Sequence, residues 1–335
     1  MSILVTGGAG YIGAITAEVL LEHGYEVVIY DNLSHGFRDA VPQGAHFEPG
    51  EVADGEKLES LLRRHQVTGV MHFAAWIEVG ESMRDPGKYL NNNFSAPLAL
   101  LEAMRRTAVR DLVLSSTAAV YGLPESVPIR EGAPLRPINP YGLSKLMLET
   151  ALAWQARSHG LRYAALRYFN AAGATRERGE RHQPESHLIP LVMEAALGRR
   201  EAIEIYGDDY DTPDGTCIRD YIHVRDLAEA HVIALRRLAV DAGAEPAGPV
   251  APDLARRAYN LGNGRGFSVR EVIAAVERIS GRKVPVRIAP RRPGDPARLI
   301  ASADKMLAAG WRPRYAELEP IVESAWRWLI AREAH

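Results

Sequence analysis

The sequence predicts an α/β protein with a doubly wound parallel sheet and a smaller C-terminal lobe. First, short apolar or β-branched runs alternate with segments of helical periodicity up to about residue 170. Second, a glycine-rich turn joins the first predicted strand to the first predicted helix. These two features are typical of the Rossmann fold, in which ligands bind at the carboxyl ends of the parallel strands.

The first unit of the chain has the order strand, glycine turn, helix, strand and acid. Residues 3–6 are an apolar run, and residues 26–30 are a β-branched one. Between them, apolar residues at helical spacing lead to Gly24, which is a typical helix terminator. Asp31 follows the second run directly. This order is that of a dinucleotide-binding unit.

Each part of this unit has a chemical reason. Gly7, Gly10 and Gly13 allow a tight turn, admit a pyrophosphate to the helix N-terminus and let helix and strand pack closely. Asp31 can accept hydrogen bonds from both hydroxyls of an adenine ribose and would repel a 2'-phosphate. The unit therefore predicts NAD rather than NADP as the cofactor.

The alternation continues through the first half of the chain and weakens afterwards. The segments predicted next are a helix around 58–62, a strand at 69–73, a helix ending at 106, a strand at 111–115 and a strand at 163–169. The later ones are loops at 175–185 and 208–215, a helix at 225–238, a linker at 239–252, a strand at 258–261 and a helix begun by a capping box at Ser268. We place an NAD-binding domain at 1–170 and a substrate-binding lobe at 171–335, with segments near 219–238 and 258–264 packing back on the first domain.

Composition narrows the class of partner. The 335 residues are 47% hydrophobic and 24% charged, and 40 Lys and Arg against 42 Asp and Glu leave a net charge of -2. This balance gives no electrostatic reason to expect nucleic acid or a membrane surface. A single cysteine, Cys217, excludes an internal disulfide, and no run has the length of a membrane span or the pattern of a signal peptide. We expect a cytoplasmic protein with a small-molecule partner and no bound metal, and we interpret His182 and His187 as loop or pocket residues.

Tyr141 and Lys145 are the main candidates for catalysis. The Asn-Pro dipeptide before them can begin a helix, and residues four apart lie on one helix face. An ammonium group near a phenol favours the phenolate and lowers its pKa, so that tyrosine can act as a general base. The hydroxyls of Ser115 and Thr117 follow a predicted strand and should reach the same edge. Together these groups can remove a proton from an alcohol as hydride leaves for NAD.

Five stretches carry a resemblance to a known family over nearly the whole chain. They are residues 6–13, 79–82, 166–170, 214–224 and 291–295. In these stretches the chain resembles the extended short-chain dehydrogenase/reductases, and among these the UDP-glucose 4-epimerase family. The resemblance implies that UDP-galactose and UDP-glucose are interconverted through a transient 4-keto sugar, with bound NAD and in a homodimer.

The resemblance also implies roles for individual residues. Tyr141 is the base, Lys145 lowers its pKa and holds the nicotinamide ribose, and Thr117 takes the place of the usual active-site serine. The implied NAD-binding residues are Gly7, Gly10, Tyr11, Ile12, Gly13, Asp31, Asn32, Glu51, Val52, Phe73, Ala74, Ala75, Asn93, Ser115, Tyr141, Lys145 and Tyr168. The implied UDP-sugar-binding residues are Thr117, Tyr141, Asn170, His187, Leu188, Tyr206, Arg219, Arg292, Asp295 and Leu299.

Three alternatives are weighed against this interpretation. A 4,6-dehydratase needs acidic residues just after the strand-end threonine, where this chain has Ala118 and Ala119. A non-catalytic NAD-binding protein has no need of Thr117, Tyr141 and Lys145. The third alternative, a 4-epimerase that acts on UDP-pentoses or UDP-uronic acids, remains open because these motifs do not determine which sugar is bound.

The residue with the clearest consequence for sugar range is Leu299. In the family, tyrosine at this position goes with restriction to UDP-glucose and UDP-galactose, and a small residue goes with acceptance of the N-acetyl sugars. Leucine is intermediate in size, so we expect partial acceptance of UDP-N-acetylhexosamines. Other departures from the common pattern are Ile77 for a lysine, Glu51 for an aspartate and His187 for an asparagine.

Overall fold

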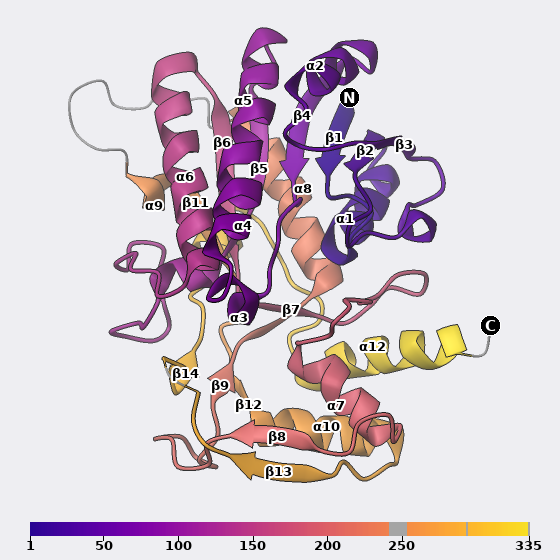
Figure 1. Ribbon diagram of the computed structural model, residues 1–335, viewed down its shortest axis with the longest axis vertical. Helices are drawn as coiled ribbons and strands as arrows, with labels where there is room; N and C mark the ends of the chain where they lie inside the picture. The colour runs from indigo at the N-terminus through magenta and orange to yellow at the C-terminus, as the bar shows by residue number, and fades with distance from the viewer. Residues whose placement is uncertain (241–252, 293, 334–335) are drawn as a thin grey trace.

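A seven-stranded parallel sheet forms the centre of the larger lobe (Figure 1). The computed structural model describes residues 1–240, 253–292 and 294–333, so residues 241–252 of the predicted linker lie outside it. The strand order is β11-β6-β5-β4-β1-β2-β3, and the winding direction reverses between β1 and β4. The strands are β1 (Ser2–Thr6), β2 (Glu26–Asp31), β3 (His46–Pro49), β4 (Val67–His72), β5 (Asp111–Thr117), β6 (Arg162–Tyr168) and β11 (Ala258–Leu261). The predicted doubly wound Rossmann fold is confirmed.

Helices cover both faces of this sheet. On one face lie α1 (Tyr11–Glu22) and α8 (Val224–Val240), and on the other lie α2 (Gly55–Arg64), α5 (Ala96–Arg106) and α6 (Pro140–His159). Successive strand residues point to opposite faces. In β1, Ile3 and Val5 belong to the core beneath α1 and α8, whereas Leu4 belongs to the core beneath α2, α5 and α6. Because both faces are covered, the central strands carry apolar side chains toward both faces, whereas the edge strand β3 is polar and partly exposed.

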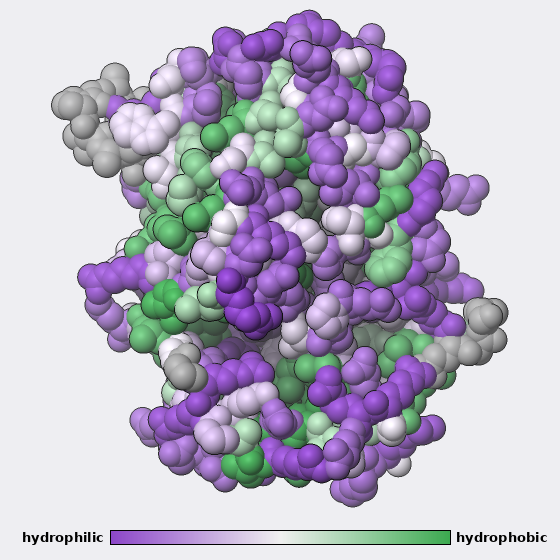
Figure 2. All heavy atoms as spheres, in the orientation of Figure 1, coloured by the Kyte–Doolittle hydropathy of each residue, from purple (hydrophilic) through white to green (hydrophobic). Residues whose placement is uncertain are grey.

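The helix that carries Tyr141 begins where the sequence predicts. The Asn139 side chain caps α6 by accepting a 2.8 Å hydrogen bond from the backbone N–H of Gly142, and Pro140 occupies the first helical position. The helix ends at Gly160, whose φ of 67° is in the left-handed region. On its outer face α6 exposes Trp154, and the neighbouring α5 exposes Leu98. Figure 2 shows apolar residues over this pair of helices.

Short helical segments connect the strands on the ligand-binding side. Before α5 lie α3 (Val79–Ser82), α4 (Pro86–Leu90) and a π-helical segment, Asn91–Ser95. Arg38–Ala40 and Ala118–Tyr121 are 3-10 helices that follow β2 and β5. The segment after β5 is therefore a tight turn that returns the chain close to the end of its strand.

A second core lies below the main sheet. It is formed chiefly by α7 (Leu188–Ala196), α10 (Val269–Ser280) and α12 (Leu318–Glu333), and Ser268 and Glu271 make the predicted capping box of α10. Its small sheets pair β8 (Ile203–Tyr206) with β13 (Val286–Ala289), β9 (Ile218–Arg219) with both β12 (Phe267–Ser268) and β14 (Arg298–Leu299), and β7 (Asn170–Ala172) with β10 (Tyr221–His223). Two short helices, α9 (Leu254–Arg257) and α11 (Asp304–Ala308), complete the described elements.

The chain passes between the two regions repeatedly. After entering the smaller lobe at β7, it returns to the main sheet as α8 and as β11, the strand paired with β6. No helix among the described residues has the length and apolar character needed to cross a membrane.

Candidate active site

A large cavity at the carboxyl ends of the strands lies where the sheet reverses its winding. It has a volume of about 520 Å³. This is the place at which open α/β sheets bind dinucleotides. The predicted cofactor residues that line it are Gly7, Gly10, Tyr11, Ile12, Gly13, Asp31, Asn32, Glu51, Val52, Phe73, Ala74, Ala75 and Ser115.

The glycine turn forms a cradle that side chains would fill. Gly7 has a φ of 69°, and a Cβ there would lie 2.5 Å from the backbone nitrogen of Ala74. A Cβ on Gly13 would lie 2.3 Å from the carbonyl oxygen of Gly7. The loops can therefore approach closely only with glycine at these positions, which leaves the N-terminus of α1 facing the cavity. These residues fit a dinucleotide pyrophosphate.

Asp31 is held at the end of β2 by two backbone hydrogen bonds. Its carboxylate oxygens accept from the N–H groups of Ala9, at 2.9 Å, and Leu33, at 2.8 Å. Burial raises the pKa of this carboxyl above its ordinary value, although both hydrogen bonds act in the other direction. Each carboxylate oxygen has a further lone pair, so the group can still accept from ribose hydroxyls. The nearby Asn32 amide donates to Glu51 at 3.0 Å.

Four predicted cofactor residues do not line this cavity: Asn93, Tyr141, Lys145 and Tyr168. The fully buried Asn93 amide accepts from the Trp76 N–H at 2.8 Å and donates to the Trp76 carbonyl at 2.9 Å, so its contacts fix the loop after β4. The preceding Asn91 and Asn92 line the cavity instead. The run of three asparagines was the available signal, but the sequence does not reveal which of them faces the ligand.

Tyr141, Lys145 and Thr117 meet at the end of β5. The Tyr141 hydroxyl is hydrogen-bonded to Thr117, and the Lys145 ammonium donates to the Ser115 carbonyl at 2.9 Å. Gly142 makes this approach possible, because a Cβ there would lie 2.6 Å from the carbonyl oxygen of Ala119, in the turn after Thr117. The first turn of α6 is thus pressed against the strand end.

Burial dominates the electrostatics of this pair. It raises the pKa of the Tyr141 phenol, with Glu78 acting in the same direction and the Thr117 hydrogen bond acting against it. Burial also lowers the pKa of Lys145 to about 8, which the neighbouring Glu149 partly offsets. The expected lowering of the tyrosine pKa is therefore absent in the protein alone. Additional positive charge beside the phenol would be needed to produce it.

The predicted substrate residues of the smaller lobe form two groups. In the first, the Arg219 guanidinium donates to the Asp295 carboxylate, and Leu299 of β14 lies opposite Arg219 in β9. In the second, the Arg292 guanidinium lies 3.7 Å from the centre of the Tyr206 ring. Leu299 also packs against a small apolar cluster, which consists of Ala118, Val120 and Tyr121 from the turn after Thr117 together with Ile129. That contact places it near the turn after Thr117.

The remaining predicted substrate residues lie at junctions between the lobes. The Asn170 side chain donates to the Asp220 carbonyl at 2.8 Å, and Leu188 is the first residue of α7. The imidazole of His187, just before that helix, contacts the carboxylates of Glu180 and Glu185. Its side chain is thus already engaged within its own segment.

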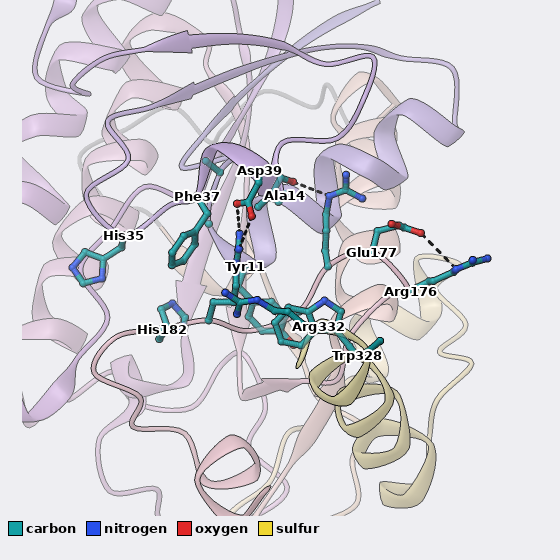
Figure 3. Close-up of a pocket in the computed structure, with 17 residues that line it drawn as sticks. Tyr11, Ala14, His35, Phe37, Asp39, Arg176, Glu177, His182, Trp328 and Arg332 are labelled. Carbon is teal, nitrogen blue, oxygen red and sulfur yellow. Dashed lines mark hydrogen bonds and ion pairs between the residues drawn. The ribbon is translucent and has the colours of Figure 1, made fainter. Parts of the chain in front are cut away.

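A second cavity, of about 450 Å³, is lined by the residues drawn in Figure 3. Tyr11, His35 and His182 line both cavities. Residues of the 175–185 segment form one wall, and Arg181 ties that segment to the loop after β2 by a 2.7 Å hydrogen bond to Asp39. The segment was predicted as a loop, and it separates the two cavities.

Comparison with known proteins agrees with this geometry. Residues 3–248 match the model of the NAD dependent epimerase/dehydratase family, and the chain belongs to that family. A UDP-glucose 4-epimerase of Streptomyces lividans is 53% identical over 97% of this chain and 95% of its own. The structure of UDP-glucose 4-epimerase from Brucella ovis in complex with NAD is 47% identical, with a TM-score of 0.90 over 97% of both chains. Within its family the chain therefore belongs with the UDP-glucose 4-epimerases.

A further solved structure bears on the sugar. The UDP-Glc/GlcNAc 4-epimerase from Campylobacter jejuni is 40% identical to this chain, with a TM-score of 0.83 over 98% of this chain and 99% of its own. Proteins of this fold thus include one named for both the plain and the N-acetylated sugar.

Proposed function

We propose that the protein interconverts UDP-galactose and UDP-glucose by oxidising and re-reducing carbon 4 of the hexose. The observation that carries this proposal is the meeting of Thr117, Tyr141 and Lys145 at the end of β5, beside a cavity that fits NAD. Bound NAD supplies the hydride acceptor at carbon 4. Because the hydride returns to the same sugar, the reaction is an isomerisation with no net redox change.

Side chains of the protein transfer the proton of the sugar 4-hydroxyl. Tyr141 accepts the proton of the 4-hydroxyl as carbon 4 is oxidised, and Thr117 orients that hydroxyl and the phenol. Lys145, held by the Ser115 carbonyl, contributes positive charge and a donor to the cofactor ribose. The 4-keto sugar then turns and presents its other face, and Tyr141 returns the proton as carbon 4 is reduced. Carbon 4 is thereby inverted.

We further propose that the smaller lobe holds the nucleotide and leaves the hexose free to turn. Arg219 and Arg292 bring guanidinium groups suited to a diphosphate, and Tyr206, beneath Arg292, offers a ring face to the uracil. The proposed UDP-sugar set is Thr117, Tyr141, Asn170, His187, Leu188, Tyr206, Arg219, Arg292, Asp295 and Leu299. Of these, Leu299 packs against the apolar cluster that includes the turn after Thr117, and so it is the best placed to limit the size of the sugar.

The dehydratase alternative finds no support at this site. The residues after Thr117 are Ala118 and Ala119, which carry no acid or base, and the next polar side chain of the turn, Tyr121, donates to Asn260 at 2.6 Å. A dehydratase must move a proton at carbon 5 and at the departing hydroxyl. This turn offers no carboxylate for that purpose.

The direct test is to incubate the purified protein with UDP-galactose, without added NAD, and follow UDP-glucose by chromatography. We expect conversion, because the cofactor is regenerated in each cycle and does not need to leave its site between turnovers. UDP-N-acetylgalactosamine in a parallel reaction is expected to turn over partially. If neither is converted after NAD is supplied, the proposed function is wrong.

We also propose that the protein is a cytoplasmic homodimer joined through α5 and α6. These helices lie side by side (Figure 1) and expose the large side chains of Leu98 and Trp154, which are 40% and 49% accessible. Replacing Trp154 with Glu should convert the dimer to a monomer in light scattering after gel filtration. A monomeric parent protein would contradict the proposal.

A further inference from the structure

Four side chains suited to metal binding converge in the segment between the two cavities and α7. Glu180, His182, Glu185 and His187 each offer one ligand atom, and these atoms all lie within 4.8 Å of one another. The sequence led us to expect no metal, because the histidines show no ligand spacing with cysteine. In this cluster the partners of the histidines are carboxylates.

The contacts within the cluster have nearly the size of a metal coordination shell. One oxygen of Glu180 lies 2.9 Å from Nδ1 of His182 and 2.8 Å from Nδ1 of His187, and an oxygen of Glu185 lies 2.9 Å from the same His187 atom. Around a tetrahedral Zn²⁺ with bonds of about 2.0–2.1 Å, the ligand atoms are about 3.4 Å apart. An ion at the centre therefore requires these contacts to widen by about 0.5 Å.

The charge of the cluster also calls for a cation. The side chains of Glu180 and Glu185 are only 8% and 9% exposed, so two carboxylates share a site with little water. A divalent ion balances both charges while the imidazoles stay neutral.

The cluster joins the cofactor cavity to the smaller lobe. His182 lines the cavity at one end of the segment, and His187 immediately precedes α7 at the other. Tyr11, the first residue of α1, lies close enough to the carboxylates for Glu180 and Glu185 to add to the rise in its pKa that burial causes. A link across the four residues would fix the wall of the cofactor cavity relative to α7.

We propose that Glu180, His182, Glu185 and His187 bind a divalent transition-metal ion as a structural site. Zn²⁺ fits this set, because it accepts imidazole and carboxylate ligands in four-coordinate geometry. With four protein ligands the site is closed, and the ion has no part in the chemistry at carbon 4. The His187 imidazole then serves the ion, and His187 of the proposed UDP-sugar set can contact the nucleotide only through its backbone. Its effect is to hold the segment that separates the two cavities.

A second histidine and carboxylate cluster provides an internal control. His46, Glu48 and His65 also lie within reach of one another, but the Arg64 guanidinium already contacts Glu48 at 2.5 Å. The His46 side chain is 51% exposed. The Arg64 guanidinium and the surrounding water already stabilise the negative charge of Glu48, so we expect no metal there.

The test compares the metal content of the parent protein with that of E180Q and E48Q. Each is produced in medium supplemented with Zn²⁺, freed of any histidine tag, passed through gel filtration and analysed by mass spectrometry of the metals. We expect about one equivalent per chain in the parent and in E48Q, and at least a tenfold lower content in E180Q. No stoichiometric metal in the parent, or equal content in E180Q, would overturn the proposal.

A measurement on the parent alone guards against a misfolded variant. The metal-free protein is titrated with Co²⁺, whose visible absorption is intense in four-coordinate sites and weak in six-coordinate ones. We expect intense bands that saturate at about one equivalent and disappear on addition of Zn²⁺. Weak bands, or bands that Zn²⁺ does not displace, would count against a four-coordinate site.

Discussion

Tyr141 and Lys145 reach the same strand end through different contacts. The spacing of four residues predicts that both lie on one helix face, and their contacts with Thr117 and Ser115 agree with that placement. What the spacing does not give is the degree of burial, which raises the tyrosine pKa and lowers that of the lysine. Burial depends on the whole fold packed around the pair, so the local sequence carries no signal of it.

Replacing Tyr141 with Phe should abolish turnover and spare NAD binding. The ring stays, and only the group that moves the proton is removed, so we expect a loss of at least about 10²- to 10⁴-fold in kcat. The measurement is the rate of UDP-glucose formation beside cofactor content from the absorbance of the released nucleotide. Tyr89→Phe is the control, because Tyr89 lies next to Tyr141 and donates to Glu81. Unchanged turnover in Y141F would refute the assigned role.

Replacing Leu299 with Tyr should narrow the sugar range. The larger ring would fill space beside the turn after Thr117, where Leu299 packs against the cluster of Ala118, Val120, Tyr121 and Ile129. We expect kcat/KM for UDP-N-acetylgalactosamine to fall at least about tenfold relative to UDP-galactose. Leu307→Tyr on the exposed side of α11 serves as the control. If the ratio of kcat/KM for the two UDP-sugars is unchanged in L299Y, Leu299 does not determine the sugar range.

At the scale of elements, the strongly periodic or apolar segments were predicted well and the short polar ones were missed. β1, β2 and α6 follow from buried runs and a capping pattern. β3 was missed because His46–Pro49 is polar, half exposed and pairs on one side only, at the edge of the sheet. The strands of the smaller lobe have only two to four residues, which is too short for periodicity to define them.

Two glycines of α6 should respond differently to alanine. A Cβ at Gly142 would lie 2.6 Å from the Ala119 carbonyl, so G142A must move the first turn of the helix away from Thr117. We expect roughly a 10- to 10²-fold loss of kcat, because catalytic groups tolerate little displacement. Gly160 has open space around its Cβ position but a φ of 67°, so G160A should cost about 1–2 kcal/mol of stability and leave kcat unchanged. Equal kcat in both variants would show that a Cβ at position 142 does not displace the first turn of α6 from Thr117.

At the scale of the whole molecule, buried histidines make the stability of the fold depend on pH. His72, His223 and His231 are at most 2% exposed and lie in β4, β10 and α8. His231 is fixed as a neutral tautomer, because Nδ1 contacts the Leu227 carbonyl at 2.8 Å and Nε2 contacts the Tyr168 hydroxyl. Burial lowers the pKa of His72 to about 3 and those of His223 and His231 to about 4.

The free energy of unfolding should therefore fall as pH drops below about 6.5. In that range the unfolded chain binds protons at these histidines and the native chain does not, which favours unfolding by up to about 1.4 kcal/mol per pH unit for each histidine. Urea unfolding at pH 7, 6 and 5 measures the slope. His231→Gln should make the slope shallower, and the exposed His159→Gln should not. Identical slopes in H231Q and the parent would show that His231 does not contribute to the pH dependence of the free energy of unfolding.

The return of the chain to the main sheet has a consequence for how the protein can be divided. A fragment ending near residue 170 would keep the glycine turn, Thr117 and Tyr141, yet it would lose the edge strand β11 and the helix α8 that covers one face. The apolar side chains beneath α8 would then face water, including Val113 and Leu166. Catalytic and sugar-binding halves therefore cannot be exchanged between relatives by a single crossover, and functional chimaeras need at least three junctions.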